Sequence, residues 1–181
     1  MTKKNHSLLH LVLSALFLAL ALVLPFLTGQ IKQLGNALCP MHIPVILCGF
    51  FCGPLYALAV GVIAPLLRFA LFGMPPVIPT GLAMCFELAT YGVVAGVLYR
   101  ALPKKPVFIY VSLIAAMLAG RLVWGAVQWV LLGVGKTEFG WPVFFAGAFT
   151  NAIPGIILQL VLIPLLVMVL TKAFPKLKPQ E

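Results

Sequence analysis

Three ionisable side chains lie within long apolar runs of the sequence: Arg68, Glu87 and Arg121. A charge at the centre of a membrane helix costs about 3 kcal/mol, so such residues usually line a path for a substrate or an ion. A guanidinium offers a planar fork of N–H donors to a carboxylate or phosphate, whereas a glutamate accepts hydrogen bonds. The three residues therefore indicate a binding site for a small organic molecule.

Helical spacing groups other side chains with these charges. Arg121, Trp124 and Gln128 follow the i, i+3, i+7 pattern of one helix face, and Glu87 and Tyr91 follow i, i+4. Together they supply an arginine fork, a carboxylate and an indole ring. This combination suits a small planar or anionic organic ligand.

Polar residues at the ends of the apolar runs extend the candidate site. His42 begins an apolar run, where it could contact the ligand or simply lie at the membrane interface. We predict that the following residues bind the ligand: Gln30, Asn36, His42, Arg68, Glu87, Tyr91, Arg121, Trp124, Gln128 and Asn151.

A structural alternative is that Glu87 pairs with one arginine only to hold two helices together. The second arginine would then have no acidic partner, because the remaining acids, Glu138 and Glu181, lie in a loop and at the C-terminus. A buried positive charge needs a partner or water. A ligand carboxylate or phosphate could pair with this charge, and a lipid headgroup could pair with Arg68.

The composition excludes an ordinary water-soluble fold. The hydrophobic fraction is 63% and the charged fraction 8%, whereas soluble domains have about 45–50% and about 25%. The same figures exclude intrinsic disorder. The net charge of +9 comes from lysines and arginines clustered between apolar runs, which is typical of membrane topology and not of nucleic-acid binding.

We expect an all-α integral membrane protein with a single six-helix domain over residues 1–181. A helix that crosses the hydrocarbon needs about 20 mostly apolar residues. Proline and glycine breaks divide the longer apolar runs, and Pro154 and Pro164 are expected to kink the last one. The predicted spans are 8–27, 41–53, 55–73, 81–99, 107–133 and 143–170.

The basic residues orient these six spans. One side of the membrane would hold Lys3, Lys4, Arg100, Lys104, Lys105, Lys172, Lys176 and Lys178, and the other side only Lys32 and Lys136. Basic loops stay in the cytoplasm, so both termini are predicted to be cytoplasmic. With about 1.5 Å of rise per residue, the three buried charges fall in the outer half of the bilayer, and the ligand should enter from outside.

The four cysteines are expected to be small apolar packing residues without disulfides. The segment Cys39-Pro-Met-His42 alone supplies too few ligands for a metal site, which needs three or more. No cofactor or metal is therefore expected.

Three features make the chain resemble the S component, the substrate-binding subunit, of an energy-coupling factor (ECF) transporter. One is six spans in a short chain with both termini inside. Another is Ala15-Leu-Phe-Leu-Ala19 on the first span, which resembles the family's contact with a transmembrane coupling subunit. The third is Met41-His-Ile-Pro-Val-Ile-Leu-Cys-Gly-Phe-Phe-Cys-Gly-Pro54, followed by the span that contains Gly61; it resembles the family's second-to-third span hairpin.

The resemblance implies that the chain sits in a prokaryotic plasma membrane and captures a vitamin or related micronutrient from outside. It would then deliver this ligand together with the coupling (T) subunit and two cytoplasmic ATPases. Ala15 and Ala19 would contact the coupling subunit. The chain has no Gly-x-x-x-x-Gly-Lys-Ser/Thr loop, so ATP hydrolysis would belong to its partners and the chain itself would not be an enzyme.

Two ligands are suggested at this stage. The segments Leu24–Gln30, Phe72–Pro76 and Phe86–Gly92 resemble a subgroup predicted to take up cobalamin precursors, dimethylbenzimidazole or its riboside. A benzimidazole would stack on Trp124 and bond to Glu87. Pantothenate is similarly plausible, because its carboxylate would answer the surplus arginine.

Other classes of function are a polytopic membrane enzyme, a stand-alone ion-coupled carrier and a structural membrane subunit. An enzyme would use His42 and Glu87 as an acid–base or metal pair, but no further metal ligands accompany them. A carrier would usually show internal repeats and charges at the midplane, and neither is evident. A structural subunit would leave the arginines unexplained.

Overall fold

The computed structural model describes residues 3–28, 37–134, 140–148 and 150–174. Within these ranges the chain is helical and contains no β-strand, so the predicted all-α class is confirmed. Short turns of helix interrupt the longer elements at η1 (Leu24–Thr28) and η2 (Val77–Gly81).

Among the described residues, five helices are long and apolar enough to cross a membrane. They coincide closely with the spans expected at 8–27, 55–73, 81–99 and 107–133 and with the C-terminal part of the span expected at 143–170. Their bounds are α1 Lys3–Val23, α4 Pro54–Phe72, α5 Leu82–Ala101, α6 Pro106–Val134 and α8 Ile153–Ala173.

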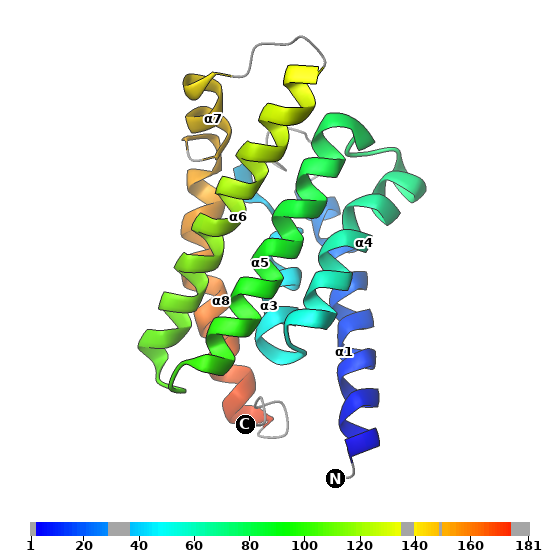
Figure 1. The fold of residues 1–181 in the computed structure, drawn as a ribbon. Helices are drawn as coiled ribbons and strands as arrows, with labels where there is room; N and C mark the ends of the chain where they lie inside the picture. Colours follow the sequence, from blue (N-terminus) through cyan, green and yellow to red (C-terminus); the bar gives the residue numbers. More distant parts are fainter. Residues whose placement is uncertain (1–2, 29–36, 135–139, 149, 175–181) are drawn as a thin grey trace.

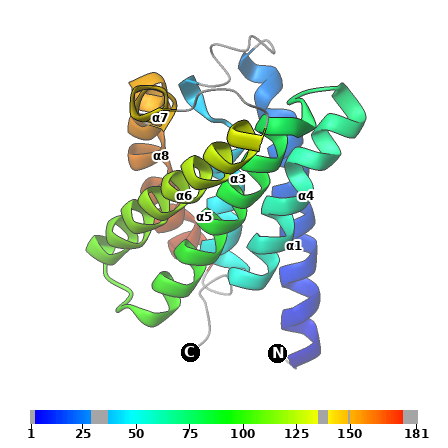
Figure 2. The same ribbon diagram turned by 45° about the horizontal axis from the view of Figure 1, so that its top comes forward.

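The helices form a bundle with α5 near its centre (Figure 1). α1 and α4 lie on one side of α5, α6 and α8 lie on the other, and α3 (His42–Phe51) is enclosed between them (Figures 1 and 2). The beginning of α1 and the end of α8 lie at the same end of the bundle. α7 (Trp141–Ala148) and the connection from α4 to α5 lie at the opposite end.

The second predicted span, 41–53, is not of spanning length. α3 contains only 10 residues, or about 15 Å at 1.5 Å of rise per residue, about half of the hydrocarbon thickness. α3 ends at Phe51. Gly53, with φ 100°, then turns the chain, and Pro54 begins α4. Every residue of α3 is buried, so its apolar character reflects enclosure by other helices.

The predicted sixth span, 143–170, is divided in the structure. α7 ends at Ala148, a 3₁₀ turn η3 covers Thr150–Ala152, and α8 begins at Ile153. Pro154 does not kink a continuous helix. It occupies the first turn of α8, where a backbone N–H would have no partner within the helix, so the N–H that proline lacks is not missed. Pro164 lies inside α8.

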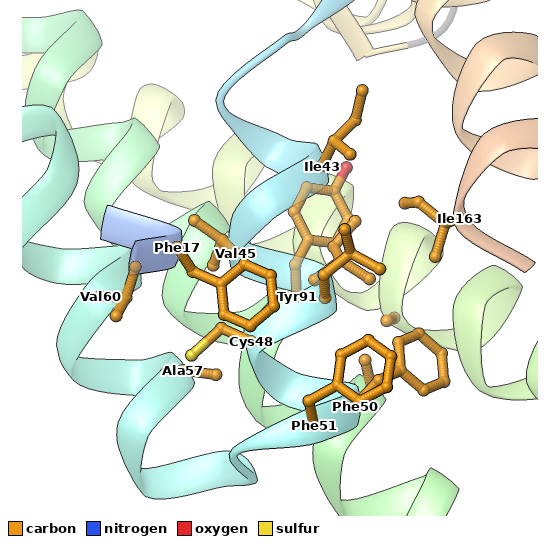
Figure 3. Close-up of a cluster of buried hydrophobic side chains, with 14 of the residues drawn as sticks. Phe17, Ile43, Val45, Cys48, Phe50, Phe51, Ala57, Val60, Tyr91 and Ile163 are labelled. Carbon is orange, nitrogen blue, oxygen red and sulfur yellow. The ribbon is translucent and has the colours of Figure 1, made fainter. Parts of the chain in front are cut away.

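Aromatic and aliphatic side chains fill the bundle around α3 (Figure 3). The rings of Phe17 and Phe51 are stacked with centroids 6.3 Å apart, and Phe50 meets Tyr99 edge to face at 4.8 Å. Tyr91 stands beside Ile43 in the same cluster. Tyr91 connects this apolar cluster to the buried polar residues, because its ring also contacts His42.

Glycines allow α3, α4 and α5 to approach closely. A Cβ at Gly49 would lie 2.5 Å from the Gly92 carbonyl oxygen, and a Cβ at Gly92 would lie 2.6 Å from the Ala57 Cβ. A Cβ at Gly61 would lie 2.6 Å from the Ala89 nitrogen. Small residues at such contacts are how membrane helices gain packing without a hydrophobic driving force.

We predict that Gly92→Ala destabilises the protein by about 1–3 kcal/mol, the usual range for overpacking, although alanine is the better helix former. The reason is the clash with Ala57. Thermal unfolding in detergent measures the effect. Ala59→Val adds bulk at an exposed position of α4 and serves as the control. Equal unfolding temperatures for both variants would contradict the assigned contact.

Candidate functional site

Glu87 is the centre of a buried polar group. Its Oε1 lies 2.9 Å from Arg121 Nη1 and 3.4 Å from His42 Nε2, and all three residues are buried. Both contacts are ion-pair distances, but neither has hydrogen-bond geometry. The carboxylate thus bridges side chains from α3 and α6 while its oxygen keeps capacity to accept a further donor.

The guanidinium of Arg121 is engaged on both of its terminal nitrogens. Nη1 faces Glu87, and Nη2 donates to Cys39 Sγ at 3.5 Å. Cys39 has φ 47°, a left-handed conformation that residues other than glycine rarely adopt. Such conformations gather at functional sites. We refer to Cys39, His42, Glu87, Tyr91 and Arg121 as the central polar cluster.

The local sequence explains how α6 reaches this cluster. Gly120 directly precedes Arg121, and a Cβ there would lie 2.8 Å from the Tyr91 ring. The missing side chain lets α6 pack against that ring, which brings the guanidinium beside Glu87. Tyr91 lies one turn after Glu87 on α5 and is fully buried.

The first residue of α3 completes the cluster. The His42 ring meets the Tyr91 ring edge to face, with centroids 5.2 Å apart. His42 and Gly49 are seven residues apart and therefore share a helix face, and Gly49 packs closely on α5. The close α3–α5 contact thus directs the imidazole toward Glu87.

Several buried polar atoms of the described structure have no hydrogen-bond partner. Such atoms are rare in native proteins and mark strain or a binding function. They are both ring nitrogens of His42, Glu87 Oε1, Arg121 Nε, Gln128 Oε1 and Gln159 Oε1.

Arg68 does not belong to this cluster. Its Nη1 donates to the Leu22 carbonyl in the last turn of α1 at 2.9 Å. Its guanidinium carbon lies 5.4 Å from the centroid of Phe26 and 5.5 Å from that of Phe72. Cation–π contacts of this kind stabilise a charge without an acidic partner. The structure therefore separates the two arginines that the sequence placed in one pocket.

Two predicted residues on α6 lie farther along the helix. Trp124 is half-buried and packs on α7, with its ring 6.5 Å from that of Phe144 and its indole against Gly147. Gln128 is buried, with its amide oxygen unpaired. The expectations for Gln30 and Asn36 lie outside the described residues, as does the side chain of Asn151.

Sequence reasoning assigned Cys39 to apolar packing, whereas the structure places its sulfur against Arg121. Its position three residues before His42 was the available signal. Within the described ranges no three Cys, His, Asp or Glu side chains converge as metal ligands. The central polar cluster offers charged groups, hydrogen-bonding atoms and an aromatic ring to an organic group.

Comparison with known proteins identifies the family. A family model described as the substrate-specific component of ECF transporters matches residues 9–167. The chain belongs to this family. It is thus a substrate-binding S component of a membrane transporter, and the family is one of transport components, not of enzymes. No curated protein and no solved structure matches the chain.

The family explains why ionisable groups persist inside this bundle. An S component binds a substrate, and ionisable residues inside a membrane bundle usually mark such a site. The resemblance inferred from the sequence is confirmed at the level of the family. The central polar cluster, on three helices of this S component, is its strongest candidate for substrate binding.

Proposed function

We propose that this S component captures a vitamin-like small molecule from outside the cell at the central polar cluster. The observation that carries the proposal is the buried Glu87–Arg121 pair with unpaired polar atoms on neighbouring side chains. A pair that only joined two helices would gain from complete hydrogen bonding, because buried unpaired groups cost about 1–3 kcal/mol each. A ligand that satisfies them would recover this free energy.

Delivery of the ligand would require a transmembrane coupling subunit and two cytoplasmic ATPases. Ala15 and Ala19 of α1 support this part of the proposal, because both are exposed on the bundle surface. Small residues on an exposed helix face let another helix approach closely.

We further propose that the protein lies in the cell membrane with both termini in the cytoplasm, as the distribution of basic residues favours. The shared end of the bundle for the start of α1 and the end of α8 agrees with this orientation (Figure 1). α3, enclosed by the other helices, would serve as the second of six membrane segments.

The ligand is proposed to be a cobalamin precursor, either dimethylbenzimidazole or its riboside, or pantothenate. Sequence resemblance favours the first, and the arginine fork was the reason for the second. His42, Glu87, Tyr91 and Arg121 are the proposed contacts in the cluster, and Trp124, Gln128 and Asn151 are proposed to add contacts toward α7 and η3. Gln30 and Asn36 remain proposed contacts from the segment that precedes α3.

Mass spectrometry of small molecules released from the purified, detergent-solubilised chain tests this proposal. We expect one compound in near-stoichiometric amount from the wild type and much less from Glu87→Ala. A chain that releases no compound, or equal amounts from both proteins, would contradict ligand binding at the cluster. Conversion of the compound during incubation would instead indicate an enzyme.

A further inference from the structure

We propose that the ligand of the central polar cluster is a neutral molecule that both donates and accepts hydrogen bonds, and not a carboxylate or phosphate. This inference rests on the proposed function and concerns the same site. It follows from the partners that the structure assigns to the buried cations, and it separates the two candidate ligands.

Both terminal nitrogens of Arg121 already have partners in the structure, and its Nε is the nitrogen that lacks one. Carboxylates and phosphates are bound best by two parallel N–H donors of one guanidinium. Here Nη1 already faces Glu87 at 2.9 Å and Nη2 donates to Cys39 Sγ. An incoming carboxylate that used two parallel donors would have to displace Glu87 or Cys39 from a terminal nitrogen, and it would lie beside the Glu87 carboxylate, which is 1% exposed. Two buried carboxylates would then share one arginine, and like charges in such a site repel strongly.

Arg68 is not positioned to replace it. Its guanidinium is held by the Leu22 carbonyl and by the rings of Phe26 and Phe72. These two rings also contact one another edge to face at 4.9 Å. Among the described residues, each of the two buried arginines therefore already has partners for its charge, Glu87 for Arg121 and two aromatic rings for Arg68.

Outside the Glu87–Arg121 pair, the unpaired atoms belong to one imidazole and two amides. The imidazole of His42 has one donor and one acceptor nitrogen when neutral, and an amide has both an oxygen and an NH₂ group. Gln128 and Gln159 are buried amides of this kind. Such groups match hydroxyl, amide or ring N–H functions of an uncharged ligand.

Gln159 is the contact that we propose from α8. Gly155, Gln159 and Ile163 follow one another at intervals of four residues and so share a helix face. Gly155 packs against the backbone of Ala37 and Leu38, directly before Cys39. The side chain of Ile163 points toward the region of Tyr91 and Ile43 in Figure 3. Gln159 therefore faces the bundle interior between two contacts that flank the cluster.

The candidate ligands differ in this property. A benzimidazole has a ring N–H and an acceptor nitrogen. Its riboside carries the ribose in place of the N–H hydrogen and donates through hydroxyl groups instead, and both compounds are mainly uncharged at neutral pH. Pantothenate carries a carboxylate. The geometry points to the first class of molecule, whereas the arginines considered from the sequence alone allowed both.

Matched ligand pairs test the inference on the full chain in detergent by titration calorimetry. One pair is benzimidazole and benzimidazole-5-carboxylate, and another is pantothenol and pantothenate. The compound that co-purifies with the chain is compared with its nearest analogue of opposite charge class. We expect the neutral member to bind at least tenfold more tightly in each pair that binds. Tighter binding of an acid, or an anionic co-purifying compound, would overturn the inference.

Glu87→Gln provides a second test, because it keeps the shape of the side chain and frees Arg121 from its counter-charge. We expect the affinity ratio of acid to neutral ligand to rise at least tenfold over the wild type. An unchanged ratio in a variant with wild-type unfolding temperature would show that the Glu87–Arg121 pair does not set the charge preference. Failure to bind any compound in the wild type would instead count against the proposed function.

Discussion

Arg121→Ala is expected to weaken ligand binding by the purified S component about a hundredfold or more. The substitution removes the partner of a carboxylate that is 1% exposed, and loss of one member of a buried pair typically costs about 3–5 kcal/mol. Each 1.4 kcal/mol corresponds to a tenfold change in affinity. Part of this cost will appear as lower stability, so thermal unfolding must be measured alongside binding.

Arg68→Ala is the matched control, because Arg68 is also a buried arginine but contacts Leu22, Phe26 and Phe72. We expect its dissociation constant to stay within a few-fold of the wild type. The double variant Glu87→Gln/Arg121→Met removes both charges and should recover stability without recovering binding. Normal binding by Arg121→Ala, or equal losses for the two arginines, would contradict the cluster as the ligand site.

The long helices were predictable from the sequence because the requirement for about 20 apolar residues acts on each of them alone. α3 was located as the span expected at 41–53, but its 10 residues are too few to span the hydrocarbon, and its enclosure by neighbouring helices was not predicted. The break before α8 was also missed. Pro154 is compatible with a kink or with a first turn, and only the packing of α7 decides between them.

The central polar cluster was predicted in part. Charge type and helical spacing identified Glu87, Tyr91 and Arg121, because an ionisable residue inside a membrane must face the interior of the bundle. Which arginine pairs with Glu87 depends on how helices are rotated and how closely they pack. Gly120 determines that approach for Arg121, whereas two phenylalanines hold Arg68 at the end of α1, and no spacing rule connects those residues.

Ala15→Trp or Ala19→Trp is expected to abolish transport while the isolated chain binds its ligand normally. Both alanines are exposed on α1. This helix is the least enclosed of the five long ones, since 17% of its apolar span is buried in the bundle against 50% for Val77–Ala101. An indole there would not disturb the bundle. It would prevent close approach of a coupling subunit, because helix contacts in lipid depend on small residues.

Leu118→Trp is the control, because Leu118 is 51% exposed on α6, on the other side of the bundle from α1 (Figure 1). Uptake of labelled ligand into vesicles that contain the whole transporter measures transport, and co-purification measures assembly. We expect the control to transport and assemble, and the α1 variants to do neither. If the α1 variants transport normally, the coupling surface lies elsewhere; if they lose ligand binding as well, their defect is in the fold of the chain. Retained binding with lost assembly is the result that separates capture of the ligand from its delivery.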